Sequence, residues 1–151
     1  LYCLGAGGSG WGDPLSRSVD AVVNDVFGGV VSLEMAAQIY GVSINPDGSA
    51  NVDSTNELRH AARIRRLATA EVDSGYPIED MRGECPHCGT NVTAGEAKLI
   101  EVPWQELGPA YSRFTETAFR MLAGVCRTCG TLIATRNHLD SALAVSAPKP
   151  A

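Results

Sequence analysis

The chain has 151 residues, of which 19% are charged and 6% aromatic, and it holds no apolar run near the roughly 20 residues of a membrane helix. Its formal net charge is −5: residues 1–84 carry 6 Lys and Arg against 12 Asp and Glu, and residues 85–151 carry 6 against 5. This balance argues against nucleic-acid binding, which needs a basic face to meet phosphates. The start, Leu1–Leu4, lacks the basic region of a signal peptide, so the sequence predicts a cytoplasmic protein without a membrane partner.

A glycine-rich run, Gly5-Ala6-Gly7-Gly8-Ser9-Gly10-Trp11-Gly12, opens the chain and contains a literal G-x-G-x-x-G. A dinucleotide fingerprint needs a strand before the glycines and a helix that opens within them. Here only four apolar residues precede the run, and Asp13-Pro14 delays any helix. The run instead predicts an extended arm whose backbone passes close to another surface, with Trp11 as a candidate anchor.

Three helical segments follow the arm. The first has an apolar stripe over residues 18–27 and ends at a glycine pair, and the second runs from a Ser32 cap to Tyr40. Between the second and third, alternating apolar residues flank an Asn-Pro-Asp-Gly turn at 45–48, which predicts a short hairpin. The third helix is predicted from the capping-box spacing of Ser54 and Glu57 to about Glu71.

The third predicted helix carries an apolar stripe that includes Leu58, Ile64 and Leu67. It also carries the cationic or titratable side chains Arg59, His60, Arg63, Arg65 and Arg66. Such a run is usually a solvated helix face, and otherwise a docking patch for an acidic partner. Residues 72–84 are polar and rich in turn formers, which predicts a linker.

Two Cys-x-x-Cys-Gly motifs organise the rest of the chain: Cys85-Pro86-His87-Cys88-Gly89 and Cys126-Arg127-Thr128-Cys129-Gly130. Four thiolates in this spacing can hold one tetrahedral zinc ion, so the predicted ligands are Cys85, Cys88, Cys126 and Cys129. Two disulfides would need an oxidising compartment, and a redox site would need one motif only. His87 can replace a thiolate or hydrogen-bond a sulfur, or face solvent as a turn residue.

The predicted fold class is α+β, with a small helical N-terminal segment and a glycine-rich extended arm followed by a four-cysteine zinc ribbon with a small antiparallel sheet. Strands are predicted at 98–102, 119–125 and 131–135. The predicted domains are 1–71, a linker at 72–84, a ribbon at 85–141 and a flexible tail at 142–151. Four thiolates leave zinc no open position for water, so the ion is predicted to be structural. The sequence contains no catalytic motif, and no catalytic residue is predicted.

The run Gly7–Arg17 resembles the carboxy-terminal segment of the hydantoinase B / 5-oxoprolinase family, where a glycine-rich stretch leads into Gly-(Tyr/Trp)-Gly-Asp-Pro-Leu-x-Arg. The similarity continues through Val22–Val26, Gly29–Val42, an Asp-Gly turn and a final helix, and covers about residues 5–68. Members of that family are several hundred residues long. The chain therefore corresponds to their tail, followed by a ribbon that most members lack.

A tail of this kind joined to a zinc ribbon resembles the small zinc-binding subunits of ketone carboxylases of the acetophenone carboxylase type. That resemblance implies a non-catalytic structural zinc subunit in a hetero-oligomer, with large hydantoinase A-like and B-like partners that bind ATP and Mg²⁺ or Mn²⁺. It implies that this chain completes the B-like partner through Gly8, Gly10, Trp11, Gly12, Asp13, Pro14 and Leu15. The alternative is a nucleic-acid-binding or regulatory zinc-ribbon protein, which rests on the two cysteine motifs and on the Arg59–Arg66 run.

Overall fold

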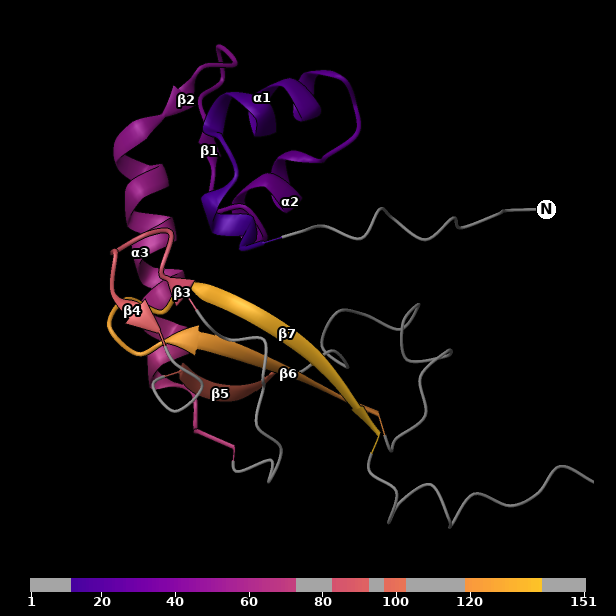
Figure 1. Cartoon of the computed structure of the whole chain (residues 1–151). Helices are drawn as coiled ribbons and strands as arrows, with labels where there is room; N and C mark the ends of the chain where they lie inside the picture. The colour runs from indigo at the N-terminus through magenta and orange to yellow at the C-terminus, as the bar shows by residue number, and fades with distance from the viewer. Residues whose placement is uncertain (1–11, 73–82, 93–96, 103–118, 140–151) are drawn as a thin grey trace, which may run out of the picture. The chain divides into compact units, whose positions relative to one another are not determined.

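The structure is a computed structural model that describes residues 12–72, 83–92, 97–102 and 119–139 (Figure 1). The chain forms two compact units, Leu1–Ala62 and Arg63–Ala151, with the division inside one helix. Gly8, Gly10 and Trp11 of the predicted arm lie outside the described residues, as do the predicted tail and most of the predicted linker. No helix within the described ranges is long and apolar enough to cross a membrane.

The first unit is built from short elements, each ended by a polar cap or a glycine. A 3-10 turn precedes two helices, a two-stranded antiparallel hairpin and the start of a long helix: η1 Pro14–Ser16, α1 Val19–Phe27, α2 Leu33–Gln38, β1 Ser43–Ile44, β2 Ala50–Asn51 and α3 Val52–Ala68. The Ser32 hydroxyl accepts a hydrogen bond from the Met35 amide, as predicted for the cap of α2. Helix α2 ends at Gln38, two residues before the predicted end.

The start of α3 differs from the prediction. The helix begins at Val52, so Ser54 already lies inside it and the predicted capping box is wrong. The Asn51 side chain accepts a hydrogen bond from the Ser54 amide at 3.0 Å and supplies the N-terminal cap instead. The predicted apolar stripe is also wrong in part, because Leu58 and Ile64 remain exposed while Thr55 is buried. The Thr55 hydroxyl accepts from the amide of Ser43, which ties α3 to the hairpin.

The core of the first unit is small. Its cluster of fully buried side chains comes from α1, α2 and the segment before β1, and consists of Val22, Ala36 and Val42. Half-buried apolar residues pack around these three: Val19, Val23, Val26, Val31, Tyr40 and Ile44. A core of this size supplies little burial, because valine and alanine offer small side chains.

The second unit is a small antiparallel β structure. A two-stranded sheet, β3 Gly83–Glu84 with β4 Asn91–Val92, flanks the first cysteine motif. A three-stranded sheet has the order β5-β6-β7, with β5 Ala97–Val102, β6 Phe119–Cys126 and β7 Leu132–Leu139. Short helices followed by small antiparallel sheets around four cysteines confirm the predicted α+β class with a ribbon.

Alternation along the strands sends side chains to two faces of the three-stranded sheet. On one face Leu99 of β5 and Leu122 of β6 pack with Cys126 and Cys85. On the other face Ile100, Ala123 and Val125 form a second cluster. The period of two that places Leu122 on the cysteine face also places Cys126 there, four residues further along β6. The sheet thereby places Cys126, one of the predicted ligands, on the same face as Cys85.

Candidate metal centre

The two cysteine motifs form the same tight turn. In each, the amide of the glycine donates to the carbonyl of the first cysteine, at 2.9 Å for Gly89 to Cys85 and 2.8 Å for Gly130 to Cys126. Both glycines have φ of +73°, a left-handed conformation that side chains other than glycine adopt at a cost. The turn explains why glycine follows the second cysteine in both motifs. We call these turns the first knuckle (residues 85–90) and the second knuckle (residues 126–131).

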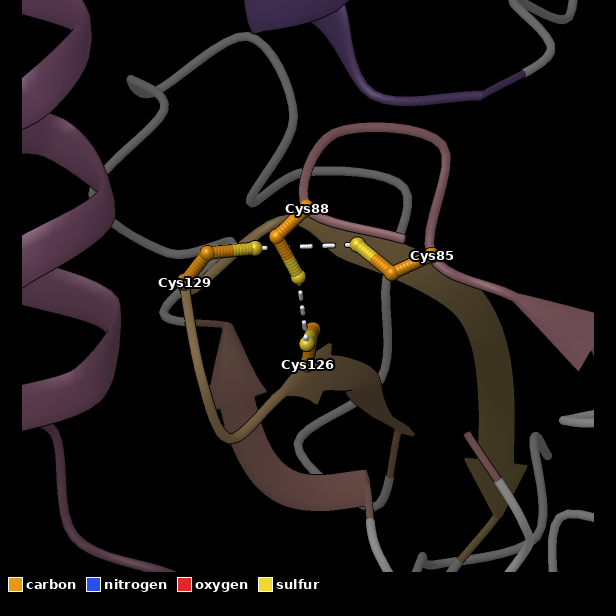
Figure 2. A group of neighbouring side chains, drawn as sticks. All are labelled: Cys85, Cys88, Cys126 and Cys129. Carbon is orange, nitrogen blue, oxygen red and sulfur yellow. Dashed lines mark hydrogen bonds between the residues drawn. The ribbon is translucent and has the colours of Figure 1, made fainter. Parts of the chain in front are cut away.

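The four sulfurs converge on one point (Figure 2). Cys85 Sγ lies 3.6 Å from Cys129 Sγ, Cys88 Sγ lies 3.7 Å from Cys126 Sγ, and all four atoms lie within 4.8 Å of one another. Zn–S bonds of about 2.3 Å in a tetrahedron require S···S distances of about 3.8 Å. These distances far exceed a disulfide bond of about 2.05 Å, and all four cysteines are free. The donor set and its spacing therefore fit a tetrahedral zinc ion.

The thiols differ in their acidity. Hydrogen bonds from the Thr90 hydroxyl and amide lower the pKa of Cys88 to about 6. Burial raises the pKa of Cys129 to about 12, against the hydrogen bonds from Thr131. A metal ion binds thiolates and not thiols, so loading a divalent cation here displaces the protons that burial keeps on sulfur.

Sequence reasoning missed two residues of the centre, Thr90 and Thr131. Thr90 Oγ1 lies 3.2 Å from Cys88 Sγ, and Thr131 Oγ1 lies 3.2 Å from Cys129 Sγ. When the sulfur is a thiolate, the hydroxyl is the donor, which stabilises the charged form. The signal was present in the sequence, because both motifs continue as Cys-Gly-Thr.

The end of α3 packs on the second knuckle within the second unit. A Cβ atom added to Gly130 would lie 3.0 Å from the carbonyl carbon of Arg63 and closer still to its oxygen. Arg66 Nη1 donates to the Gly130 carbonyl at 3.2 Å. Further along, Lys98 Nζ donates to the carbonyl of Leu67, which satisfies one of the last carbonyls of the helix. Gly130 therefore provides both the turn and the room for the helix.

The segment after α3, residues 71–72, bonds to strand β5 and to the second knuckle. The Val72 amide donates to the Leu99 carbonyl at 2.9 Å, so the chain leaving the helix pairs with the edge strand β5. Arg127, inside the second knuckle, forms a two-pronged ion pair with Glu71, in which Nη1 lies 2.9 Å from Oε2. The ion pair lowers the pKa of the Glu71 carboxyl.

The other predicted site residues have different surroundings. Asp13 and Leu15 are buried, and the Asp13 carboxylate accepts a hydrogen bond from the Leu15 amide at 3.0 Å, which caps the turn at Pro14. Gly12 is exposed with φ of +85°. Their contacts with a partner stay predictions. Among the described residues, the cluster that could hold a metal ion contains the four cysteines and not His87.

Two arginines of the predicted basic face of α3 donate hydrogen bonds to backbone carbonyls of their own unit. Arg59 donates to the carbonyls of Tyr40 and Arg17, at 3.2 and 2.7 Å, within the first unit. Arg66 donates to Gly130 within the second unit. Guanidinium groups held by backbone carbonyls in this way are a poor platform for phosphates.

Three curated relatives match the chain. It is 37% identical over 110 residues to the acetone carboxylase alpha subunit of Xanthobacter autotrophicus, a match that covers 71% of this chain and 14% of the relative. It is 38% identical over 59 residues to the B-type subunit of a putative D-/L-hydantoinase from a Pseudomonas species, and 42% identical over 55 residues to the beta subunit of caprolactamase from Pseudomonas jessenii. The chain is similar to hydantoinase B-like subunits.

The chain spans only 10–14% of the length of these curated relatives. The shorter matches cover 39% and 36% of this chain. Because the match to the acetone carboxylase alpha subunit covers 71% of 151 residues, any placement of it includes about residues 45–107, and with them the first knuckle. No protein-family model matches the chain. No solved structure matches it either.

Proposed function

We propose that this chain is the zinc-bearing carboxy-terminal part of a hydantoinase B-like subunit in an ATP-dependent ketone carboxylase, with a structural and not a catalytic role. The observation that carries the proposal is the match to the acetone carboxylase alpha subunit. This match includes the first knuckle and at least the last part of the segment, residues 5–68, that resembles hydantoinase B proteins. The shorter relatives support the hydantoinase B-like part of the proposal.

The proposed zinc is held by Cys85, Cys88, Cys126 and Cys129. When bound, the ion links the loop after β3 to the end of β6 and so joins the two sheets of the second unit. These sheets have little core of their own, so metal binding would provide much of their folding free energy. Four sulfur ligands fill the coordination sphere, so this ion binds no substrate. Thiolate ligands favour a reducing compartment, and we place the protein in the cytoplasm.

The proposed partners are a hydantoinase A-like subunit and the body of a hydantoinase B-like subunit, which bind ATP, Mg²⁺ or Mn²⁺ and the ketone. In this assembly the present chain contributes no group to the chemistry. The substrate class we propose is a small ketone that is carboxylated by bicarbonate, with acetone and acetophenone as the two candidates. The first candidate follows the name of the relative whose match covers 71% of this chain, and the second follows the resemblance to small zinc-binding subunits.

The test is reconstitution with the large subunits from the same source. We expect ATP hydrolysis that depends on both ketone and bicarbonate, together with transfer of labelled bicarbonate into an acid-stable product. Omitting this chain should abolish both, and elemental analysis should find one zinc per chain. Full activity without the chain, or no metal in the native protein, would overturn the proposal. Acetone and acetophenone in parallel reactions distinguish the substrates.

A further inference from the structure

The first unit exposes several large apolar side chains between residues 27 and 35. Phe27, at the end of α1, is 70% exposed, and Leu33, the first residue of α2, is 61% exposed. Val30, in the loop between the two helices, is 78% exposed, and Met35, in α2, is 47% exposed. The buried cluster of the same unit consists of two valines and one alanine. The unit therefore leaves larger apolar groups in water than it buries in that cluster, which is a mark of an interaction surface.

A groove gives this surface a shape. It has a volume of about 440 Å³ and lies between the end of α1, the start of α2 and the β1–β2 turn, elements labelled in Figure 1. Its lining residues are Val26, Phe27, Leu33, Ile44, Asn45, Pro46, Asp47 and Gly48. A Cβ atom added to Gly48 would lie 3.2 Å from Cε1 of Phe27 and closer to Cζ. The ring thus rests on the bare backbone of the turn, which fixes one wall of the groove.

The charges around the groove select against two kinds of occupant. Residues 12–62 carry seven acidic and two basic side chains, a net charge of −5, which disfavours nucleic acid and a second copy of this chain. Among the described residues that line the groove, Asp47 alone is charged. Its Oδ1 accepts hydrogen bonds from the Ser49 hydroxyl at 2.6 Å and the Ser49 amide at 2.8 Å. The remaining lining is uncharged and suits an apolar partner.

The relatives indicate what that partner is. In each of them the matched segment makes up 10–14% of a longer polypeptide. In these three relatives the segment is therefore covalently joined to the remaining 86–90% of the subunit. We infer that the groove between α1, α2 and the β1–β2 turn docks an apolar element of the hydantoinase B-like body. This inference rests on the proposed function and adds the surface that would join the two parts.

The chain offers a matched pair of variants to test the docking surface. Leu33 is the first residue of α2 and Val52 is the first residue of α3, and they are 61% and 65% exposed. An acidic residue follows each of them, Glu34 and Asp53. Aspartate is favourable in the first turn of a helix, so neither Leu33→Asp nor Val52→Asp should unfold its helix. Leu33 lines the groove, and Val52 is not among the lining residues.

The experiment measures binding of the full chain to a hydantoinase B-like body from the same source, expressed so that it ends before the matched segment. We expect Leu33→Asp to weaken binding at least tenfold and Val52→Asp to change it less than twofold. In addition, a photo-crosslinking p-benzoylphenylalanine in place of Leu33, which lines the groove and is exposed, should attach to a peptide of that body, identified by mass spectrometry.

The outcomes separate this inference from the proposed function. If the unaltered chain binds the body and both aspartate variants bind equally well, the groove is not the interface, while the proposed function stands. Crosslinking of position 33 to a second copy of this chain, or to another protein, also overturns the inference. If the unaltered chain fails to bind the body and carboxylase activity does not need it, the proposed function itself is wrong.

Discussion

The two knuckle glycines allow the packing of α3 on the second knuckle to be measured. Gly89 and Gly130 have the same φ of +73° and the same place in their motifs. Alanine at either position pays the same backbone cost, about 1–2 kcal/mol for a left-handed conformation. A Cβ atom at Gly89 meets only the flexible carboxylate of Glu84, at 3.3 Å, whereas one at Gly130 meets the backbone of Arg63.

The difference between the two variants isolates the helix contact. Pushing the end of α3 away from the knuckle is an overpacking change, which costs about 1–3 kcal/mol. We therefore expect Gly89→Ala to lower the free energy of unfolding by about 1–2 kcal/mol and Gly130→Ala by about 2–5 kcal/mol. In a domain of this size each kcal/mol corresponds to a shift in Tm of about 4–8 °C.

The assay is thermal and urea unfolding of the zinc-loaded chain, with metal content checked for each variant. Hydrogen exchange should show faster exchange at amides 63–68 in Gly130→Ala than in Gly89→Ala. Asparagine provides a second pair, because it tolerates the left-handed conformation better than alanine but keeps the collision at Gly130. Equal destabilisation by the two alanine variants, with unchanged protection of residues 63–68, would refute the packing argument.

Three further predictions concern the metal centre and its neighbourhood. Cys85→Ser or Cys129→Ser should release zinc and unfold the described strands of the second unit, as measured by elemental analysis and circular dichroism; a variant that keeps its melting behaviour would contradict this. Thr131→Val removes the buried hydroxyl beside Cys129, so it should lower the free energy of unfolding by about 1–3 kcal/mol and speed the transfer of zinc to a chelator. Thr90 is exposed, so Thr90→Val should have a smaller effect. If the wild type and both variants retain zinc equally, the role given to the threonines is wrong. The ion pair with Arg127 lowers the pKa of Glu71, so it adds stability above the unfolded pKa near 4.5 and loses it as pH falls through the lower folded value. The urea midpoint of the wild type should therefore exceed that of Glu71→Gln at pH 6, and the difference should shrink as the pH falls below 4.5; a difference that does not change with pH would contradict this.

The four-cysteine cluster could largely be predicted from the sequence because the information that forms it is local. A Cys-x-x-Cys-Gly motif specifies a tight turn through the glycine, and two such turns predicted the four cysteines that the structure brings together. The helices and the hairpin of the first unit were predicted for the same reason, since Ser32, Gly28 and the Asn45–Gly48 turn act within a few residues of themselves. The threonines that follow the glycines were equally local and were overlooked.

Other features depend on residues that are distant in the sequence. The Asn51 cap of α3 is a local bond to Ser54, but Thr55 of the same helix accepts from the amide of Ser43, 12 residues earlier, across the hairpin. The arginine run on α3 predicted a solvated face or a docking patch for an acidic partner, yet Arg59 and Arg66 bond to backbone carbonyls 19 to 64 residues away in the chain.

The sequence alone determined which four cysteines come together, the ribbon class and the likeness to hydantoinase B-like subunits, because turn chemistry and motif spacing act over short stretches of chain. Only the tertiary structure decided that the second knuckle receives a helix end, that Leu58 and Ile64 of α3 stay exposed, and that Phe27 and Leu33 line an open groove. Which side chains are buried depends on what packs against them, and periodicity within one helix does not contain that information.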